Sequence, residues 1–146
     1  MRRLFHISLL LCSVGLLRGQ MDATPQQSIA RYGTPERDEL SRQTLLYFRS
    51  HGACYICHYF NGRCDVISIF SGTSEAGVPE GLDEGRITQL LDSEVSGAFW
   101  KPDRYTINRR WNSSDGKYLA IYDTMRHKLV VMSKSAYARE NKATKP

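Results

Sequence analysis

The sequence has few histidines and lacks the motifs in which acid–base and nucleophilic catalysts usually occur. Beyond residue 19 it holds three histidines, His51, His58 and His127, and no expected strand sets one of them beside both a carboxylate and an arginine. No G-x-S-x-G motif occurs, and Cys57 lies in no protease signature. The Gly-rich stretch 72–85 lacks the Lys-Ser/Thr pair of a P-loop, and its acids would repel phosphate. These absences exclude the common nucleophile and phosphate-loop motifs.

Long hydrophobic runs are also scarce, because the only one is Ile7–Leu17. It follows the basic start Met1-Arg2-Arg3 and precedes polar residues around Gly19, which is typical of a secretory signal peptide. The run is too short to span a membrane, which takes roughly 20 apolar residues. The sequence therefore predicts a signal peptide over residues 1–19, cleaved after Gly19 or, alternatively, after Ala23. A buried N-terminal helix is the other interpretation. The secreted mature chain would carry no membrane segment and would form one domain.

Cysteine is too sparse for a disulfide-rich scaffold. Cys12 leaves with the signal peptide, so the mature chain keeps Cys54, Cys57 and Cys64. An odd number allows one disulfide and a spare thiol, an intermolecular bond, or no bond. If Asn61-Gly62 forms a hairpin turn, Cys57 and Cys64 are diagonal neighbours on one face, about 7–8 Å apart. That span is strained for a disulfide, although a β-bulge would permit one.

Cys54-Tyr55-Ile56-Cys57-His58 matches the C-x-x-C-H pattern of c-type haem attachment. Strand alternation argues against it, because Cys54 and His58 would face away from Cys57 and Cys64. The same alternation argues against a zinc site. We therefore predict no cofactor and no metal, and keep a secreted c-type haem protein as an alternative function. His58 is a weak catalytic candidate, since a half-buried strand histidine with a hydrogen-bond partner is the commoner case.

Two hairpins have the clearest patterns. Asn61-Gly62 separates the β-rich runs Ala53–Phe60 and Arg63–Ser71, and Asn-Gly is a strong hairpin signal. A polar connection likewise separates Lys117–Tyr122 from Lys128–Ser133. A further strand is predicted over residues 104–111, followed by a turn over residues 112–116.

The main helix is predicted to start at Thr34, which would act as N-cap before Pro35. Its buried face would comprise Leu40, Thr44, Leu45, Tyr47 and Phe48. A short amphipathic helix is expected over Arg86–Val95. We predict an α+β fold in which one main helix packs on a mainly antiparallel sheet. The flexible lead-in would cover residues 20–33, the single domain residues 34–135, and a frayed basic tail residues 136–146.

Charge is unevenly distributed, with acids concentrated in residues 72–99 and lysine and arginine in residues 100–146. Cations with interleaved aromatic residues suit RNA, through phosphate contact and base stacking. The candidate RNA-binding residues are Arg104, Arg109, Arg110, Trp111, Lys117, Arg126 and Lys128. The alternative is a solvated sheet edge protected by charge. Asn112-Ser113-Ser114 is also an N-glycosylation sequon, which would place Asn112 on the surface.

The order of elements resembles a known family. A signal peptide, the segment Tyr32-Gly33-Thr34-Pro35-Glu36-Arg37, and the strands Tyr118-Leu119-Ala120-Ile121-Tyr122-Asp123 and Leu129-Val130-Val131-Met132 resemble the ribonuclease-like secreted effectors of powdery mildew fungi. The resemblance implies the fold of the small guanyl-specific fungal ribonucleases. It also implies secretion, delivery into host cells and interference with host immunity.

The chain departs from those ribonucleases where they carry their chemistry. Lys117 stands near their strand arginine, and no histidine occurs in or after Leu129–Ser133. No glutamate lies between Glu39 and Glu75, and no cysteine follows Cys64, although the family ties an N-terminal to a C-terminal cysteine. The sequence therefore predicts a non-catalytic, ribonuclease-like effector that binds host RNA or a host protein, with no small-molecule substrate. An active secreted ribonuclease remains the alternative.

Overall fold

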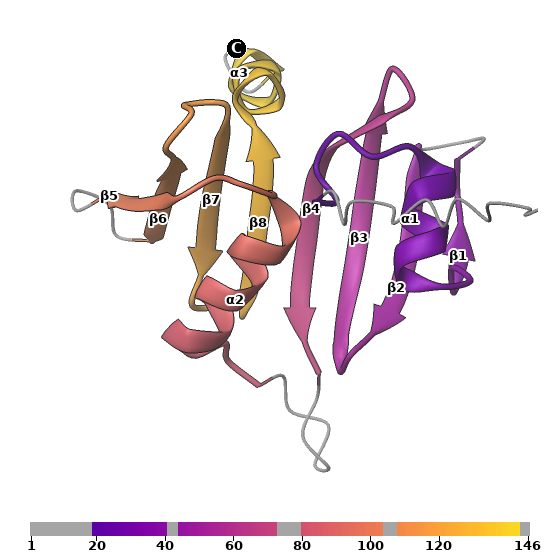
Figure 1. Ribbon diagram of the computed structural model, residues 1–146, viewed down its shortest axis with the longest axis horizontal. Helices are drawn as coiled ribbons and strands as arrows, with labels where there is room; N and C mark the ends of the chain where they lie inside the picture. Colours follow the sequence, from indigo (N-terminus) through magenta and orange to yellow (C-terminus); the bar gives the residue numbers. More distant parts are fainter. Residues whose placement is uncertain (1–18, 41–43, 73–79, 104–107, 144–146) are drawn as a thin grey trace, which may run out of the picture.

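Eight antiparallel strands form one open sheet in the computed structural model, which describes residues 19–40, 44–72, 80–103 and 108–143 (Figure 1). The sheet order is β1-β2-β3-β4-β8-β7-β6-β5. The strands are β1 (Arg37–Asp38), β2 (Leu45–Ser50), β3 (Ala53–Phe60), β4 (Arg63–Ser71), β5 (Trp100–Asp103), β6 (Arg109–Ser113), β7 (Tyr118–Asp123) and β8 (Lys128–Ser133). The helices are α1 (Pro25–Tyr32), α2 (Glu84–Glu94) and α3 (Lys134–Ala143). The predicted α+β class is confirmed, whereas a ribonuclease-like topology stays a prediction.

The β3–β4 hairpin is confirmed with its predicted bounds. Asn61 and Gly62 both have positive φ, 51° and 72°, as the central residues of a type I′ turn require. Tyr59 faces Cys64, as expected. The register then shifts, because His58 faces Val66, and Asp65 is the extra residue of a β-bulge.

The second predicted hairpin is also confirmed, as β7 and β8. β8 pairs with β4, so the two hairpins lie side by side at the centre of the sheet. The strand predicted over residues 104–111 is displaced, since β6 spans Arg109–Ser113; residues 104–107 lie outside the described part. Asn112 consequently belongs to a strand and is half-buried, rather than lying in a turn.

The helix predicted from Thr34 is wrong, because this stretch forms the edge strand β1 and its neighbour β2. Leu46 and Phe48, 0% and 1% exposed, point into the core between the sheet and the helices α1 and α2. Leu45 on the opposite face is also buried. Because both faces of β2 carry apolar residues, the sequence lacks the alternation of apolar and polar residues that predicts a strand, and its apolar spacing resembles that of a helix.

The first helix of the fold lies instead where a flexible lead-in was predicted. Thr24 caps α1, and its backbone N–H donates to Gln27 Oε1 at 2.8 Å while Gln27 N–H donates to Thr24 Oγ1 at 3.3 Å. This reciprocal capping box, with Pro25 at the first helical position, fixes where the helix starts. The frayed tail is likewise corrected, because residues 134–143 form α3 and Ala136 is 2% exposed.

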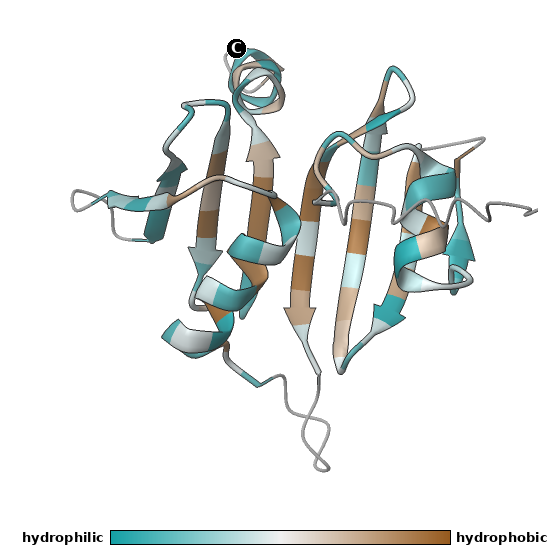
Figure 2. Cartoon of the chain, viewed as in Figure 1, coloured by the Kyte–Doolittle hydropathy of each residue, from teal (hydrophilic) through white to brown (hydrophobic). Residues whose placement is uncertain are grey.

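The two faces of the sheet are covered differently. α1 and α2 lie on one face, α1 near β2 and α2 near β7 and β8 (Figure 1). Hydrophobic residues are concentrated along the central strands beneath them (Figure 2). On the other face, α3 buries Ala136 against Val66, Leu119 and Met132. Within the described residues, the structure has no helix that is long and apolar enough to cross a membrane.

Candidate functional site

A cavity of about 370 Å³ opens between α1 and α2 above β3. Its walls come from three parts of the chain: the end of α1, the inner side of α2, and the β2–β3 hairpin. The lining residues are Arg31, Tyr32, His51, Tyr55, Arg86, Gln89, Leu90, Ser93 and Glu94. The cavity therefore combines cations, hydroxyl groups and one carboxyl group.

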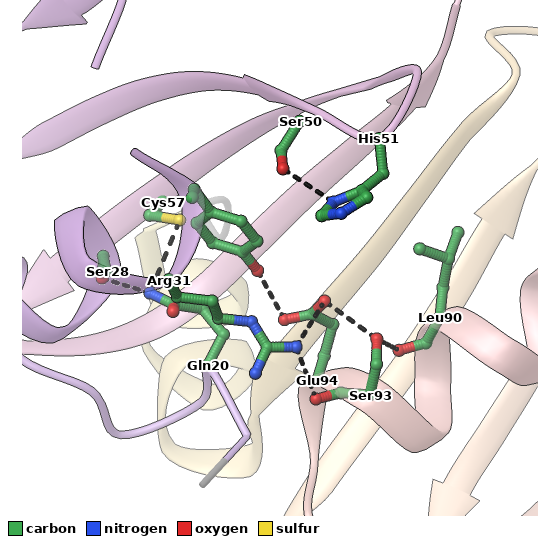
Figure 3. Close-up of polar contacts among 10 residues, drawn as sticks. Gln20, Ser28, Arg31, Ser50, His51, Cys57, Leu90, Ser93 and Glu94 are labelled. Atoms are coloured by element: carbon green, nitrogen blue, oxygen red, sulfur yellow. Dashed lines mark hydrogen bonds and ion pairs between the residues drawn. The ribbon is translucent and has the colours of Figure 1, made fainter. Parts of the chain in front are cut away.

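Glu94 is the buried carboxyl group of this cavity, and it lies at the last turn of α2 (Figure 3). Its residue is 1% exposed. The Tyr32 hydroxyl donates to it at 2.7 Å, the Ser93 hydroxyl at 3.1 Å, and the Arg31 guanidinium lies 3.5 Å away. Burial raises the pKa of Glu94, and Arg31 and the hydrogen-bond donors oppose that rise. The carboxyl group is thus fully engaged by protein groups.

Tyr32 stacks on Tyr55, with 4.5 Å between ring centroids. Burial, and next the charge of Glu94, raises the pKa of Tyr32 far above that of an ordinary phenol. The hydroxyl therefore stays protonated and acts as the hydrogen-bond donor to Glu94. This pair joins α1 to α2 across the floor of the cavity.

Arg86 lies in the first turn of α2, whose N-cap is Asp83. The backbone N–H of Arg86 donates to Asp83 Oδ1 at 2.7 Å, and its guanidinium donates to Gln89 Oε1 at 2.6 Å and to the His51 carbonyl at 3.4 Å. Among the described residues, no carboxylate forms an ion pair with this guanidinium. His51 sits in the β2–β3 turn at a positive φ of 48°, and its Nδ1 lies 2.8 Å from Ser50 Oγ.

A second cavity of about 340 Å³ adjoins the first and shares His51 and Arg86 with it. Its other lining residues are Gly52, Ala53, Ser71, Gly72, Glu80, Gly81, Leu82 and Asp83. We call the two cavities together the α1–α2 groove. Arg86 and His51 stand at its middle, where both cavities meet.

The predicted RNA-binding arginines are not gathered into one free basic surface. Arg109 forms an ion pair with Glu84 at 3.0 Å. Arg110 lies 3.9 Å from Asp103, with its guanidinium 5.2 Å from the Tyr137 ring. The two arginines are consecutive in β6, so they face opposite sides of the sheet.

The remaining predicted residues are dispersed as well. Trp111 is 8% exposed and belongs to the core. Lys117 precedes β7, whereas Arg126 and Lys128 lie at its far end, and Arg126 is 3.8 Å from Asp123. Six residues of strand, about 20 Å, separate the two ends. Arg104 lies outside the described residues.

His58 and Cys54 lie on the face of the sheet opposite the groove, and Cys57 lies in the core on the same face as the groove. His58 is half-buried on the face opposite α1 and α2, and burial lowers its pKa. Cys54 shares that face, while Cys57 is fully buried on the other. A haem attached through C-x-x-C-H needs both thiols on one side, so these residues do not fit one.

The residues of the groove were not among the sequence candidates. Arg31 lies in the segment predicted to be flexible, and His51 lies just beyond Phe48, the last residue named for the buried face of the predicted helix. The pattern Thr24-Pro25-Gln26-Gln27 could have located α1, since it combines Pro at the first position with Gln at the third. For Glu94 there is no such signal, because its burial depends on α1 packing against α2.

Comparisons with known proteins place the chain in no family. No protein-family model and no curated protein matches it. Among solved structures, it is similar to a DUF4309 family protein (YjgB) from Bacillus subtilis, with 17% sequence identity and a TM-score of 0.44. The match covers 76% of this chain and 78% of that chain.

Proposed function

We propose that this chain is a secreted, non-catalytic effector that binds host RNA, and that the RNA lies in the α1–α2 groove. The secretion and the host context rest on the signal-peptide pattern and the resemblance described above. The RNA-binding part is supported by the groove. The observation that carries it is the Arg86 guanidinium, which stands between two cavities with no acidic partner among the described residues.

The cations at the middle of the groove suit a phosphodiester ligand. Arg86 and Arg31 both line the first cavity, and Arg31 is engaged by the buried Glu94. Guanidinium groups bind phosphate through two parallel hydrogen bonds. Glu80 and Asp83 line the second cavity, so the cationic part of the groove is confined to its middle.

The size of the groove favours a single strand over a flat protein surface. Each cavity, about 370 and 340 Å³, falls in the range of pockets that hold a small ligand. RNA-binding proteins commonly accommodate unstacked bases in such sites. The proposal places one base in each of the two adjoining cavities and the phosphate that joins them at Arg86.

The proposal that the protein is not a catalyst rests on the burial of Glu94 and on the groups that contact its carboxyl group. A general acid or base must reach the proton that it transfers. Glu94 is 1% exposed, and Tyr32, Ser93 and Arg31 occupy its carboxyl group. It therefore organises the groove rather than facing a ligand.

The test is RNA binding by fluorescence anisotropy with a labelled, single-stranded oligonucleotide. We expect Arg86→Ala to weaken binding about tenfold or more, the value of a charge-assisted hydrogen bond. Arg86→Lys, which keeps the charge, should fall between it and the wild type. Arg109→Ala is the matched control, because Arg109 is paired with Glu84 outside the groove. Equal affinity of Arg86→Ala and wild type would overturn the proposal.

A second candidate function, an active ribonuclease, is favoured by one observation. Glu94, His51 and two arginines line the same cavity, an acid–base set that sequence alone did not bring together. Incubation with total RNA separates the two functions. Cleavage by the wild type that Glu94→Gln abolishes would establish the ribonuclease, whereas intact RNA together with groove-dependent binding supports the non-catalytic protein.

A further inference from the structure

Cys57 and Cys64 form a buried pair in the β3–β4 hairpin, outside the groove. They are 0% and 1% exposed and lie on the face that α1 and α2 cover. Cys64 faces Tyr59 and Cys57 faces Ile67, so the two cysteines are diagonal neighbours on adjacent strands. Regular diagonal spacing strains a disulfide. This hairpin is not regular, because its β-bulge lies between the two positions.

Cys54, Cys57 and Cys64 are free thiols in the structure, and Cys57 and Cys64 belong to the same buried core cluster. The register places Cys57 and Cys64 diagonally across the bulge. A hydrogen bond with the Cys57 thiol, and next burial, raises the pKa of Cys64. Cys64 Sγ also donates to the Val66 carbonyl at 3.7 Å, and Cys57 Sγ accepts from Gln20 Nε2 at 3.8 Å. Both contacts are long and weak, so neither prevents the two thiols from approaching each other.

Cys54 has no access to this pair. It is the third residue before Cys57 on β3, so its side chain emerges on the opposite face, half-exposed and opposite Arg49. Of the three pairings that Cys54, Cys57 and Cys64 allow, the sheet brings together only one.

We propose that Cys57 and Cys64 form an intramolecular disulfide as the secreted chain folds, and that Cys54 stays a thiol. One S–S bond forms and both S–H bonds break. The two electrons and two protons pass to a disulfide of glutathione or of a thiol–disulfide oxidoreductase, which becomes two thiols. The inference rests on the secretion part of the proposed function for its oxidising compartment, and not on RNA binding.

The bridge would strengthen the attachment of the N-terminal segment. The backbone of Cys64 donates to Ala23 O and accepts from Asp22 N–H, both at 2.8 Å. This segment leads directly into α1, which carries Arg31 and Tyr32 to the groove. A cross-link at Cys64 therefore fixes the strand on which α1 is anchored.

The experiment is refolding of the mature chain in a buffer of oxidised and reduced glutathione, followed by thiol blocking with N-ethylmaleimide in denaturant and peptide mapping. Trypsin cleaves at Arg63, which leaves Cys54 and Cys57 in peptide 50–63 and Cys64 in peptide 64–86. Fragmentation of peptide 50–63 in the mass spectrometer then shows which of its two cysteines carries the adduct. We expect these two peptides joined by one disulfide, with one N-ethylmaleimide adduct on Cys54. The Cys54→Ser variant should keep the bridge, and Cys57→Ser should show a thiol at Cys64.

Three adducts per chain, or a disulfide that includes Cys54, would overturn the inference. Mapping of the wild type decides the matter even if a variant fails to fold. Because the readout is the thiol state, it is independent of RNA affinity, so failure of this inference and failure of the proposed function are distinguishable.

Discussion

Glu94 carries a carboxyl group in the interior of the protein, where an ionised form is costly. Arg31, Tyr32 and Ser93 offset part of that cost. Burial still dominates, because the pKa of Glu94 is raised above its ordinary value. The folded protein therefore holds the Glu94 proton more tightly than the unfolded chain does.

That difference makes folding stability depend on pH with a definite sign. A carboxyl group whose pKa is raised by folding contributes stability that is present below its unfolded pKa, about 4.5. The contribution is lost as pH rises through the folded pKa. Glu94→Gln keeps the shape and cannot ionise, so the unfolding free energy of the variant minus that of the wild type should increase with pH above about 4.5.

Urea unfolding of both proteins at a series of pH values measures this difference. His58, whose pKa is lowered by burial, contributes in both proteins and cancels in the comparison. A difference that stays level or decreases between pH 4.5 and neutrality would contradict the raised pKa of Glu94.

The individual groove residues could not be predicted from the sequence. Arg31 and Glu94 are 63 residues apart in the sequence. They come into contact only because α1 and α2 lie on the same face of the sheet. By contrast, the alternation that separates Cys54 from Cys57 is local, and the structure confirms it. The positions of individual side chains could be predicted where they depend only on the alternation of faces along one strand.

At the scale of elements, local turn chemistry was the reliable signal. Asn61-Gly62 fixed the β3–β4 hairpin, and the apolar spacing of Arg86–Val95 indicated α2. Thr24-Pro25 and Thr34-Pro35 both look like the start of a helix, and only the residue at the third helical position distinguishes them. Gln27 completes a capping box after Thr24, whereas Arg37 after Thr34 cannot accept a hydrogen bond. Strand β2 was missed because apolar residues lie on both of its faces.

The N-cap of α2 has a measurable consequence. Asp83 Oδ1 accepts the Arg86 N–H at 2.7 Å, so Asp83→Ala should cost about 1 kcal/mol of unfolding free energy. Asp83→Asn retains an acceptor and should cost much less. Urea denaturation measures both. Equal losses in the two variants would show that the charge of Asp83, rather than its cap, stabilises α2.

The docking of α3 is tested by one buried and one exposed alanine of the same helix. Ala136 is 2% exposed against Val66, Leu119 and Met132, while Ala138 is exposed. Ala136→Asp buries an unpaired charge and should cost roughly 2 kcal/mol, with faster amide hydrogen exchange in α3. Ala138→Asp should change stability by less than about 0.5 kcal/mol. Equal exchange in both variants would show that α3 does not depend on this contact.

At the scale of the whole molecule, the sheet order decides which charges come together. Pairing of β4 with β8 places the β3–β4 and β7–β8 hairpins at the centre and leaves β6 and β5 at one end of the sheet. The arginines and lysines predicted to form an RNA surface are consequently spread over two faces of the sheet and both ends of β7. The same arrangement sets α1 near β2 and α2 near β7 and β8 on one face of the sheet, and the groove lies between the two helices.

The most direct test of this account is a titration of ¹⁵N-labelled protein with a short single-stranded RNA, followed by NMR. We expect the largest shift changes in the α1–α2 groove, at Arg31, His51 and Arg86, with Arg109 and Lys117 little affected. Changes concentrated on Arg109, Lys117, Arg126 and Lys128, or no changes at all, would contradict binding in the groove.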